Sequence, residues 1–186
     1  MLFRSVPIYD GDRITGARVA MGEPLLEPGD VPVILDPASG YPNGPVTGYP
    51  LAVDSLELSL SFVSMGNPHA ITFIDQPVGE FPLHTIGPMV EHHSIFPNRV
   101  NFETVNITGP GAMTARVWER GSGETMACGT GACAIAVAAR LLGIADGRVD
   151  IILPGGTLSI DWDGEGEVYL ERSEEHTSEL QSRTNL

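Results

Sequence analysis

A short segment around residue 128 carries the clearest sign of chemistry in this sequence. Residues 127–134 read Ala-Cys-Gly-Thr-Gly-Ala-Cys-Ala, so a cysteine stands directly before a glycine-flanked run of small apolar residues. Unpaired N–H groups at a helix start stabilise anions, and they can lower the pKa of an adjacent thiol or bind a carboxylate. Gly129 and Gly131 would let a ligand approach the backbone. The segment predicts a reactive Cys128; a tight turn around a buried, inert cysteine is the alternative.

The second cysteine, Cys133, falls within the predicted helix, and we expect it to be a small core residue. The two cysteines have no second Cys or His pair at the spacing of a zinc site, so we expect no metal site. Three histidines show no ligand spacing with either cysteine and are interpreted as surface or turn residues: His84, His92 and His93.

Charged and amide side chains close to turns are the other candidates. Glu119 and Arg120 precede a glycine-rich turn and the cysteine, where Arg120 could hold a carboxylate and Glu119 could accept from an ammonium group. An exposed ion pair beside a turn is the alternative. Asn67 could donate to a substrate and His69 could tune a thiol, unless residues 66–69 are only a turn. Asn101 could equally bind a ligand or cap the start of a strand.

The elements that must position these residues are short strands and one helix. Residues 132–142 are Ala-rich, apolar nearly all round and followed by Gly143, which predicts a buried helix. A shorter helix over 81–92 is expected to be interrupted at Gly87-Pro88. Strands are predicted on both sides of a turn at 10–12 and over 31–35, 56–62, 70–74, 100–107, 112–118, 149–153, 157–162 and 167–170. The fold class is therefore α+β, a sheet wrapped around a central helix.

Composition narrows the possible partners. The chain has 186 residues, 22 of them Gly and 15 Pro, and its formal net charge is −14 with ten Lys and Arg in all. Such an acidic surface disfavours nucleic acid and anionic lipid. No apolar run is long enough to span a bilayer, and no signal peptide follows Met1, so we expect a soluble cytoplasmic protein. The polar stretch 171–186 shows neither the periodicity of a helix nor that of a strand, and it is interpreted as foreign sequence or a disordered tail.

Taken together, several segments resemble the diaminopimelate epimerase family. They are Met-Gly-Glu-Pro at 21–24, Gly-Asn-Pro-His-Ala at 66–70, Asn-Arg-Val-Asn-Phe at 98–102, Glu-Arg-Gly-Ser-Gly-Glu-Thr at 119–125, the cysteine segment at 127–134, and Leu-Pro-Gly-Gly at 153–156. The resemblance covers residues 19–170. It implies domains that each wrap a mainly antiparallel, β-barrel-like sheet around a central helix, with the active site between two of them.

The resemblance also implies a function. Members of the family interconvert LL- and meso-diaminopimelate in lysine and cell-wall precursor synthesis, without pyridoxal phosphate, metal or other cofactor. One cysteine removes the α-proton and a second returns it on the opposite face. Cys128 matches the proton acceptor, and His69 and Glu119 match positions thought to influence the thiols. Substrate contacts are matched by Asn67, Asn101, Glu119, Arg120, Gly129 and Thr130.

The departures from the family pattern set the expected boundaries. No Cys-Gly-Asn-Gly segment with the partner cysteine occurs, so we expect a fragment that is inactive alone. Residues 1–20 are interpreted as a remnant of the N-terminal domain, 21–170 as the C-terminal epimerase domain and 171–186 as the tail. A homodimer is one assembly that we consider for the full-length protein. Two alternatives remain: another two-base racemase or isomerase, of proline-racemase or phenazine-synthesis type, and a non-catalytic orphan domain.

Overall fold

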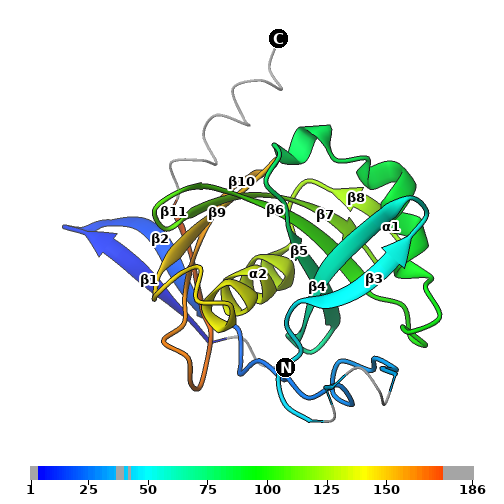
Figure 1. Cartoon of the computed structure of the whole chain (residues 1–186). Coiled ribbons are helices and arrows are strands. Elements are labelled where there is room, and N and C mark those ends of the chain that lie inside the picture. Colours follow the sequence, from blue (N-terminus) through cyan, green and yellow to red (C-terminus); the bar gives the residue numbers. More distant parts are fainter. Residues whose placement is uncertain (1–3, 37–39, 42, 174–186) are drawn as a thin grey trace.

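The computed structural model describes residues 4–36, 40–41 and 43–173, which form mostly sheet with two α-helices (Figure 1). A 3-10 helix at Val78–Glu80 precedes α1. In chain order the other elements are β1 (Arg4–Asp10), β2 (Arg13–Ala20), β3 (Tyr49–Val53), β4 (Leu56–Ser64), β5 (Pro68–Phe73), α1 (Leu83–Glu91), β6 (Asn101–Gly109), β7 (Ala112–Glu119), β8 (Gly123–Thr125), α2 (Gly129–Leu141), β9 (Val149–Leu153), β10 (Gly156–Asp161) and β11 (Tyr169–Ser173).

All the strands belong to one curved sheet. Its order is β1-β2-β11-β10-β9-β7-β6-β5-β4-β3, and β8 pairs with β7 beside this path. The pairs β5–β6 and β7–β9 are parallel and the other pairs are antiparallel. The predicted class, a mainly antiparallel sheet around a helix, is confirmed. The sheet does not close into a barrel, because β1 and β3 remain at its two ends.

The sheet curves around α2, which lies inside its concave face (Figure 1). Nine consecutive residues from Gly131 to Ala139 are buried, as expected for a helix that is apolar on nearly every side. The helix ends in a Schellman motif, in which Gly143 N–H donates to Arg140 O and Ile144 N–H donates to Ala139 O. Gly143 has φ of 70°, which explains why glycine ends this helix.

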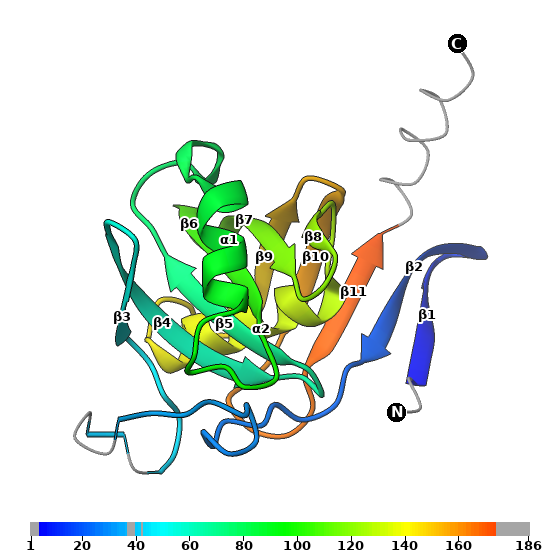
Figure 2. The same cartoon turned by 90° about the vertical axis from the view of Figure 1, so that its right-hand side faces the viewer.

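The opposite face of the sheet is covered by α1 (Figure 2). Because side chains alternate along a strand, neighbouring residues enter different cores. On β4, Val63 packs in the core around α2, whereas Phe62 packs in the core that includes Leu83 and Ile86 of α1. The middle strands are consequently buried on both faces, and polar residues there must find partners inside the protein.

Two predicted features are wrong. Residues 31–35 form no strand; their backbone bonds to loops instead, with Val33 N–H donating to Pro28 O and Ile34 N–H to Ile95 O. The helix α1 is continuous through Gly87-Pro88 rather than interrupted there. Pro88 removes only one helical hydrogen bond, and the buried face of α1 outweighs that loss.

Both ends of the described chain meet in the sheet. The hairpin β1–β2 forms around residues 10–13 as predicted and pairs with β11, where Leu170 faces Val19 and Glu171 faces Arg18. Strand β11 thus runs to Ser173, three residues beyond the end predicted for the C-terminal domain. Residues 174–186 lie outside the described residues, so the origin of the tail and the domain assignments stay predictions.

The close packing of α1 on β7 makes Gly87 a sensitive position. A Cβ at Gly87 would lie 2.6 Å from Trp118 Cδ2, and the indole cannot withdraw freely because its Nε1 donates to Glu91 Oε2. Although alanine favours helix, we expect Gly87→Ala to lower the free energy of unfolding by about 1–3 kcal/mol in urea titrations. Gly79→Ala, where nothing lies within 4 Å, is the control and should change it by less than about 0.5 kcal/mol. Equal effects would contradict this packing argument.

Candidate active site

Cys128 is the N-cap of α2, which begins three residues earlier than predicted. Its sulfur accepts a hydrogen bond from Gly131 N–H at 3.3 Å and lies 3.4 Å from the Thr130 hydroxyl oxygen. The sulfur thus takes the place of the side-chain oxygen that normally caps a helix. This capping explains how the glycine-rich residues 129–131 join the helix. The residue is 9% exposed, so the thiol is neither free in solvent nor sealed completely.

Two backbone N–H groups remain open beside the thiol. The first turn uses Gly131 N–H for the sulfur and Ala132 N–H for Cys128 O. Within the described part of the chain, no acceptor receives the N–H of Gly129 or of Thr130. The first N–H groups of a helix need partners and carry the positive end of its dipole. This end of α2 can therefore accept an anionic group next to Cys128.

A chain of hydrogen bonds leads from the thiol into the sheet. Asn67 Nδ2 donates to Thr130 Oγ1 at 3.2 Å, and Asn67 Oδ1 lies 3.2 Å from His69 Nε2. His69 Nδ1 then lies 2.6 Å from Glu103 Oε1. The structure thus brings three residues of the predicted site, Asn67, His69 and Thr130, close to Cys128, and His69 is linked to the thiol only through the other two.

Glu103 was missed by the sequence analysis. It lies on β6, is 0% exposed, and its second oxygen, Oε2, has no hydrogen-bond partner among the described residues. Its Oε1 would lie 3.0 Å from a Cβ at Gly131, so the carboxyl packs directly against the first turn of α2. The signal was present: an acid stands in the middle of a strand that also carries Phe102, Val105 and Ile107. Without knowing that helices cover both faces, one would place Glu103 on a solvent face.

Burial dominates the electrostatics of the thiol. It raises the pKa of Cys128 above the usual thiol value; hydrogen bonds from Thr130 and Gly131 N–H act in the opposite direction, and the charges of Glu103 and Glu119 raise it further. The hydrogen bonds at the helix start thus lower this pKa as the sequence analysis considered, but desolvation and the two nearby carboxyls outweigh them. For Glu103 itself, burial raises the pKa, against the lowering effect of the His69 charge and hydrogen bond.

Glu119 and Arg120 lie at the turn between β7 and β8, and Asn101 begins β6 beside that turn. Glu119 Oε1 accepts from the Thr125 hydroxyl at 2.5 Å, and Arg120 is exposed with its NH1 donating to Asn98 O at 2.9 Å. Asn101 is buried and links the start of β5 to this turn: its Nδ2 donates to Pro68 O and its Oδ1 accepts from Arg120 N–H. Of the two roles considered for Asn101, the structure thus shows the structural one.

A second missed acid, Glu91, holds this turn in place. Its carboxylate accepts from Gly121 N–H at 2.9 Å and from Trp118 Nε1 at 2.8 Å, at the end of α1. Burial alone would raise the pKa of Glu91, but the hydrogen bonds from Trp118 and Gly121 with the charges of His92 and Arg99 hold it below its usual value. Glu91 therefore positions the turn that carries Glu119 and Arg120.

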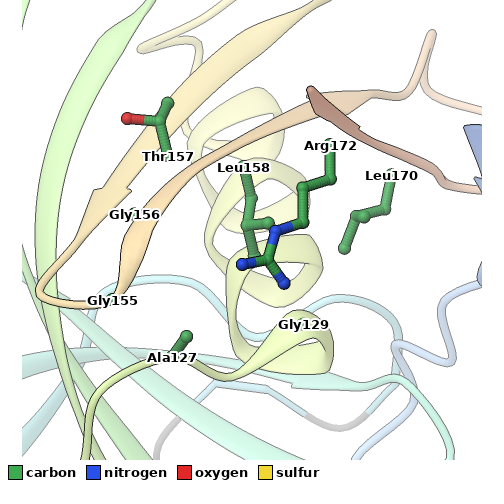
Figure 3. Close-up of a pocket in the computed structure, with 8 residues that line it drawn as sticks. All are labelled: Ala127, Gly129, Gly155, Gly156, Thr157, Leu158, Leu170 and Arg172. Carbon is green, nitrogen blue, oxygen red and sulfur yellow. The ribbon is translucent and has the colours of Figure 1, made fainter. Parts of the chain in front are cut away.

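A pocket of about 300 Å³ opens beside the start of α2 (Figure 3). Its lining includes Ala127 and Gly129 on one side and the β9–β10 turn on the other. That turn is tied to the cysteine segment because Gly155 N–H donates to Met126 O at 2.7 Å, where a Cβ at Gly155 would lie 2.9 Å from the same oxygen. The Arg172 side chain from β11 extends into the pocket (Figure 3). Cys128 does not line it.

The remaining titratable groups give no metal site. Within residues 4–36, 40–41 and 43–173, no three His, Cys, Asp or Glu side chains are arranged to hold a metal ion. Cys133 is 0% exposed, and burial with the charge of Cys128 raises its pKa to about 12, so it is the core residue that the sequence predicted. No helix in the described part of the chain is long and apolar enough to cross a membrane.

Comparison with known proteins identifies the family. The family model described as diaminopimelate epimerase matches residues 61–175, which include the whole hydrogen-bonded chain from Glu103 to Cys128. The chain belongs to the diaminopimelate epimerase family.

Relatives in this family match closely but are longer. The diaminopimelate epimerase of Desulfitobacterium hafniense is 44% identical over 160 residues, which cover 86% of this chain and 54% of that protein. The diaminopimelate epimerase of Pseudomonas entomophila is 47% identical over 152 residues, covering 82% of this chain and 52% of that protein. The chain thus spans about half the length of these relatives. Both relatives are epimerases, which are isomerases.

Solved structures share the fold at low identity. A hydroxyproline epimerase from Agrobacterium vitis, solved with trans-4-hydroxy-L-proline, superposes with a TM-score of 0.59 at 12% identity and covers 91% of this chain and 52% of that chain. A phenazine biosynthesis protein from Bacillus anthracis gives a TM-score of 0.51 at 12% identity, covering 91% and 61%. At these identities the comparison supports the diaminopimelate epimerase-like fold alone.

The raised pKa of Cys128 makes a prediction for thiol reactivity. Because the thiolate is the reactive form, alkylation by iodoacetamide should increase with pH around a midpoint above the usual value of about 8.5. Thr130→Val removes one hydrogen bond from the sulfur and should raise that midpoint further. Peptide mapping by mass spectrometry follows each cysteine, and Cys133 should stay unmodified while the protein is folded. A midpoint below that of a free thiol would refute this account of the site.

The lowered pKa of Glu91 predicts how stability depends on pH. Its pKa in the folded protein lies below the usual value of 4.5, so the ionised form stabilises the fold above the unfolded-state pKa. That contribution is lost as the pH falls through the folded-state pKa. Glu91→Gln should therefore reduce the free energy of unfolding most at pH 7, with a difference from wild type that shrinks below about pH 4.5. Urea titrations between pH 3 and 7 measure it; a difference independent of pH would exclude a role for the charge.

Proposed function

We propose that this chain is the C-terminal portion of a diaminopimelate epimerase and supplies one of two catalytic thiols, that of Cys128. The observation that carries the proposal is the sulfur at the start of a buried helix, between two hydrogen-bond donors and two open backbone N–H groups. Such a start can hold the substrate α-carboxylate beside the base that removes the α-proton.

The geometry supplies what proton removal from an α-carbon requires. That proton is weakly acidic, so the carbanion-like state needs positive potential close to the carboxylate. The N–H groups of Gly129 and Thr130 would provide it. The raised pKa of Cys128 keeps the thiolate fraction small at neutral pH but makes the thiolate, once formed, a stronger base. Hydrogen bonds from Thr130 and Gly131 N–H would stabilise that thiolate in place.

Epimerisation needs a second base, because the proton leaves one face and returns on the other. Cys133, the other cysteine of the sequence, is sealed in the core and cannot serve. We infer that the second thiol belongs to a segment outside this sequence, which fits a chain half as long as its relatives. Residues 1–20 would then be a remnant of the domain that contains that segment, and 21–170 the C-terminal domain. The homodimer stays a prediction.

The remaining proposed substrate contacts come from the turn after β7 and from two asparagine side chains. Glu119 and Arg120 stand on the turn that Glu91 holds, and Arg120 is exposed and able to meet a distal carboxylate. Asn67 has one amide hydrogen left for a substrate after its bond to Thr130, and so does Asn101 after its bond to Pro68. A free thiol base requires a reducing compartment, which supports a cytoplasmic role in lysine biosynthesis.

Turnover of the full-length protein tests this proposal. Purified chain should not epimerise LL-diaminopimelate, whereas the full-length protein that contains it should. In that protein Cys128→Ala should lower kcat by at least about a hundredfold, as expected when a general base is removed. The assay follows formation of the meso isomer and exchange of the α-hydrogen with deuterated water. Unchanged turnover in Cys128→Ala would refute the assignment.

Cys133→Ala is the matched control for the loss of a thiol. It removes the other sulfur of the same helix at a site that no substrate reaches, so kcat should remain within about twofold of wild type below the unfolding temperature. Its cost should fall on stability alone, by an amount typical of a small core truncation, about 1 kcal/mol. Thermal unfolding of both variants separates a folding defect from a catalytic one.

A further inference from the structure

Glu103 is a buried acid that the proposed reaction does not yet use. It is 0% exposed, and a carboxyl so placed needs a partner or a proton. Its one partner among the described residues is His69, also 0% exposed, at 2.6 Å, while Oε2 has none. A pair this deep that served only packing could be replaced by apolar side chains at little cost. Its position behind Asn67 and Thr130 gives it another role.

The direction of each hydrogen bond in the chain follows from the next one. Asn67 turns its Nδ2 to Thr130, so its Oδ1 accepts and His69 Nε2 must carry a hydrogen. Thr130 Oγ1 accepts from Asn67, which leaves its own hydrogen free to point at the sulfur 3.4 Å away. At the far end, two bare acceptors could not approach to 2.6 Å, so one further proton lies between His69 Nδ1 and Glu103.

We propose that Glu103 is a positioning residue for Cys128, which by sharing a proton with His69 fixes the hydrogen-bond chain in the direction that makes the Thr130 hydroxyl donate to the sulfur. The inference rests on the proposed role of Cys128 as a base. Without a carboxyl at 103, nothing holds His69 Nδ1, and the chain can also run in reverse. Thr130 would then accept from the thiol S–H, which favours the protonated form.

The negative charge of Glu103 and the chain of hydrogen bonds have opposite effects on the ionisation of Cys128. A carboxylate near the sulfur disfavours the thiolate, whereas a chain ending in a donor favours it. Replacing Glu103 by an apolar residue therefore lowers the ionisation midpoint of Cys128 if only the charge acts on the thiol. It raises that midpoint if the hydrogen-bond chain acts on the thiol. This opposition of signs separates the two roles in one measurement.

Few other titratable groups face Cys128. They are Glu119 on β7 and, through the chain, His69 on β5; Cys133 lies further along α2 and stays protonated. Of the charged groups on the other strands packed against α2, Asp150 is bound to Ser159, both Asp161 and Glu171 are bound to Arg18, and Glu57 on β4 is exposed. Arg172 on β11 extends into the pocket beside Gly129 and is the same in every variant compared.

The test measures iodoacetamide alkylation of Cys128 against pH in this chain, without turnover. Glu103→Met should raise the midpoint by about one pH unit, the tenfold effect expected for a hydrogen bond to a charged acceptor. Glu103→Gln, whose amide can still donate to His69 Nδ1, should leave the midpoint at or below that of wild type. In a Thr130→Val background the rise caused by Glu103→Met should vanish, because the chain no longer reaches the sulfur.

Two results would overturn the proposal: a lowered midpoint in Glu103→Met, or an equal rise with and without the Thr130 hydroxyl. If Glu103→Met does not fold, nitrogen-15 NMR of the His69 ring in the wild-type protein tests the proposal instead. The proposed hydrogen-bond chain requires a hydrogen on Nε2, so an Nε2 without one refutes it. The proposed function would be refuted by a different result, unchanged epimerisation in Cys128→Ala, so the two failures are distinguishable.

Discussion

The site exists because a helix that is apolar on nearly all sides must still satisfy its polar first turn. α2 is enclosed by the sheet, and its N-terminal N–H groups emerge at the edge of the core. Cys128 satisfies one of them with sulfur, Ala132 N–H bonds back to the Cys128 carbonyl, and two remain open. The same arrangement that ends the core thus creates an anion-binding position beside a thiol.

Enclosure also accounts for the unusual polarity behind the thiol. Strands β5 and β6 are covered by α2 on one face and α1 on the other, so His69 and Glu103 have no water to bond to. Each can be buried only with the other, and their shared proton then affects the orientation of every hydrogen bond up to the sulfur. Burial raises the pKa of the thiol, and the hydrogen-bonded chain partly opposes that effect.

Local patterns in the sequence predicted the elements better than their assembly. The alternation over residues 56–62 and the all-round apolar helix followed by Gly143 gave the strand, the helix and its end correctly. The helix start was placed three residues late, because propensity disfavours glycine and a sulfur cap leaves no familiar signature. Residues 31–35 resemble a strand by composition but find no neighbouring strand. Likewise, Cys128, Asn67 and His69 were proposed from turns and spacing and Thr130 from the family resemblance, whereas Glu103 and Glu91 become visible only when two covered faces and the end of α1 are in view.

The pairing of β2 with β11 joins residues 16–20 to residues 169–173, nearly the full described length of the chain apart. A lone two-stranded hairpin is marginally stable in water, so β1–β2 depends on its pairing with β11, a strand that is made much later. At ribosomal speeds the interval between them is on the order of ten seconds. During synthesis β2 must therefore wait that long for β11, and Val6, Tyr9 and Ile14 of the hairpin stay exposed even in the finished fold.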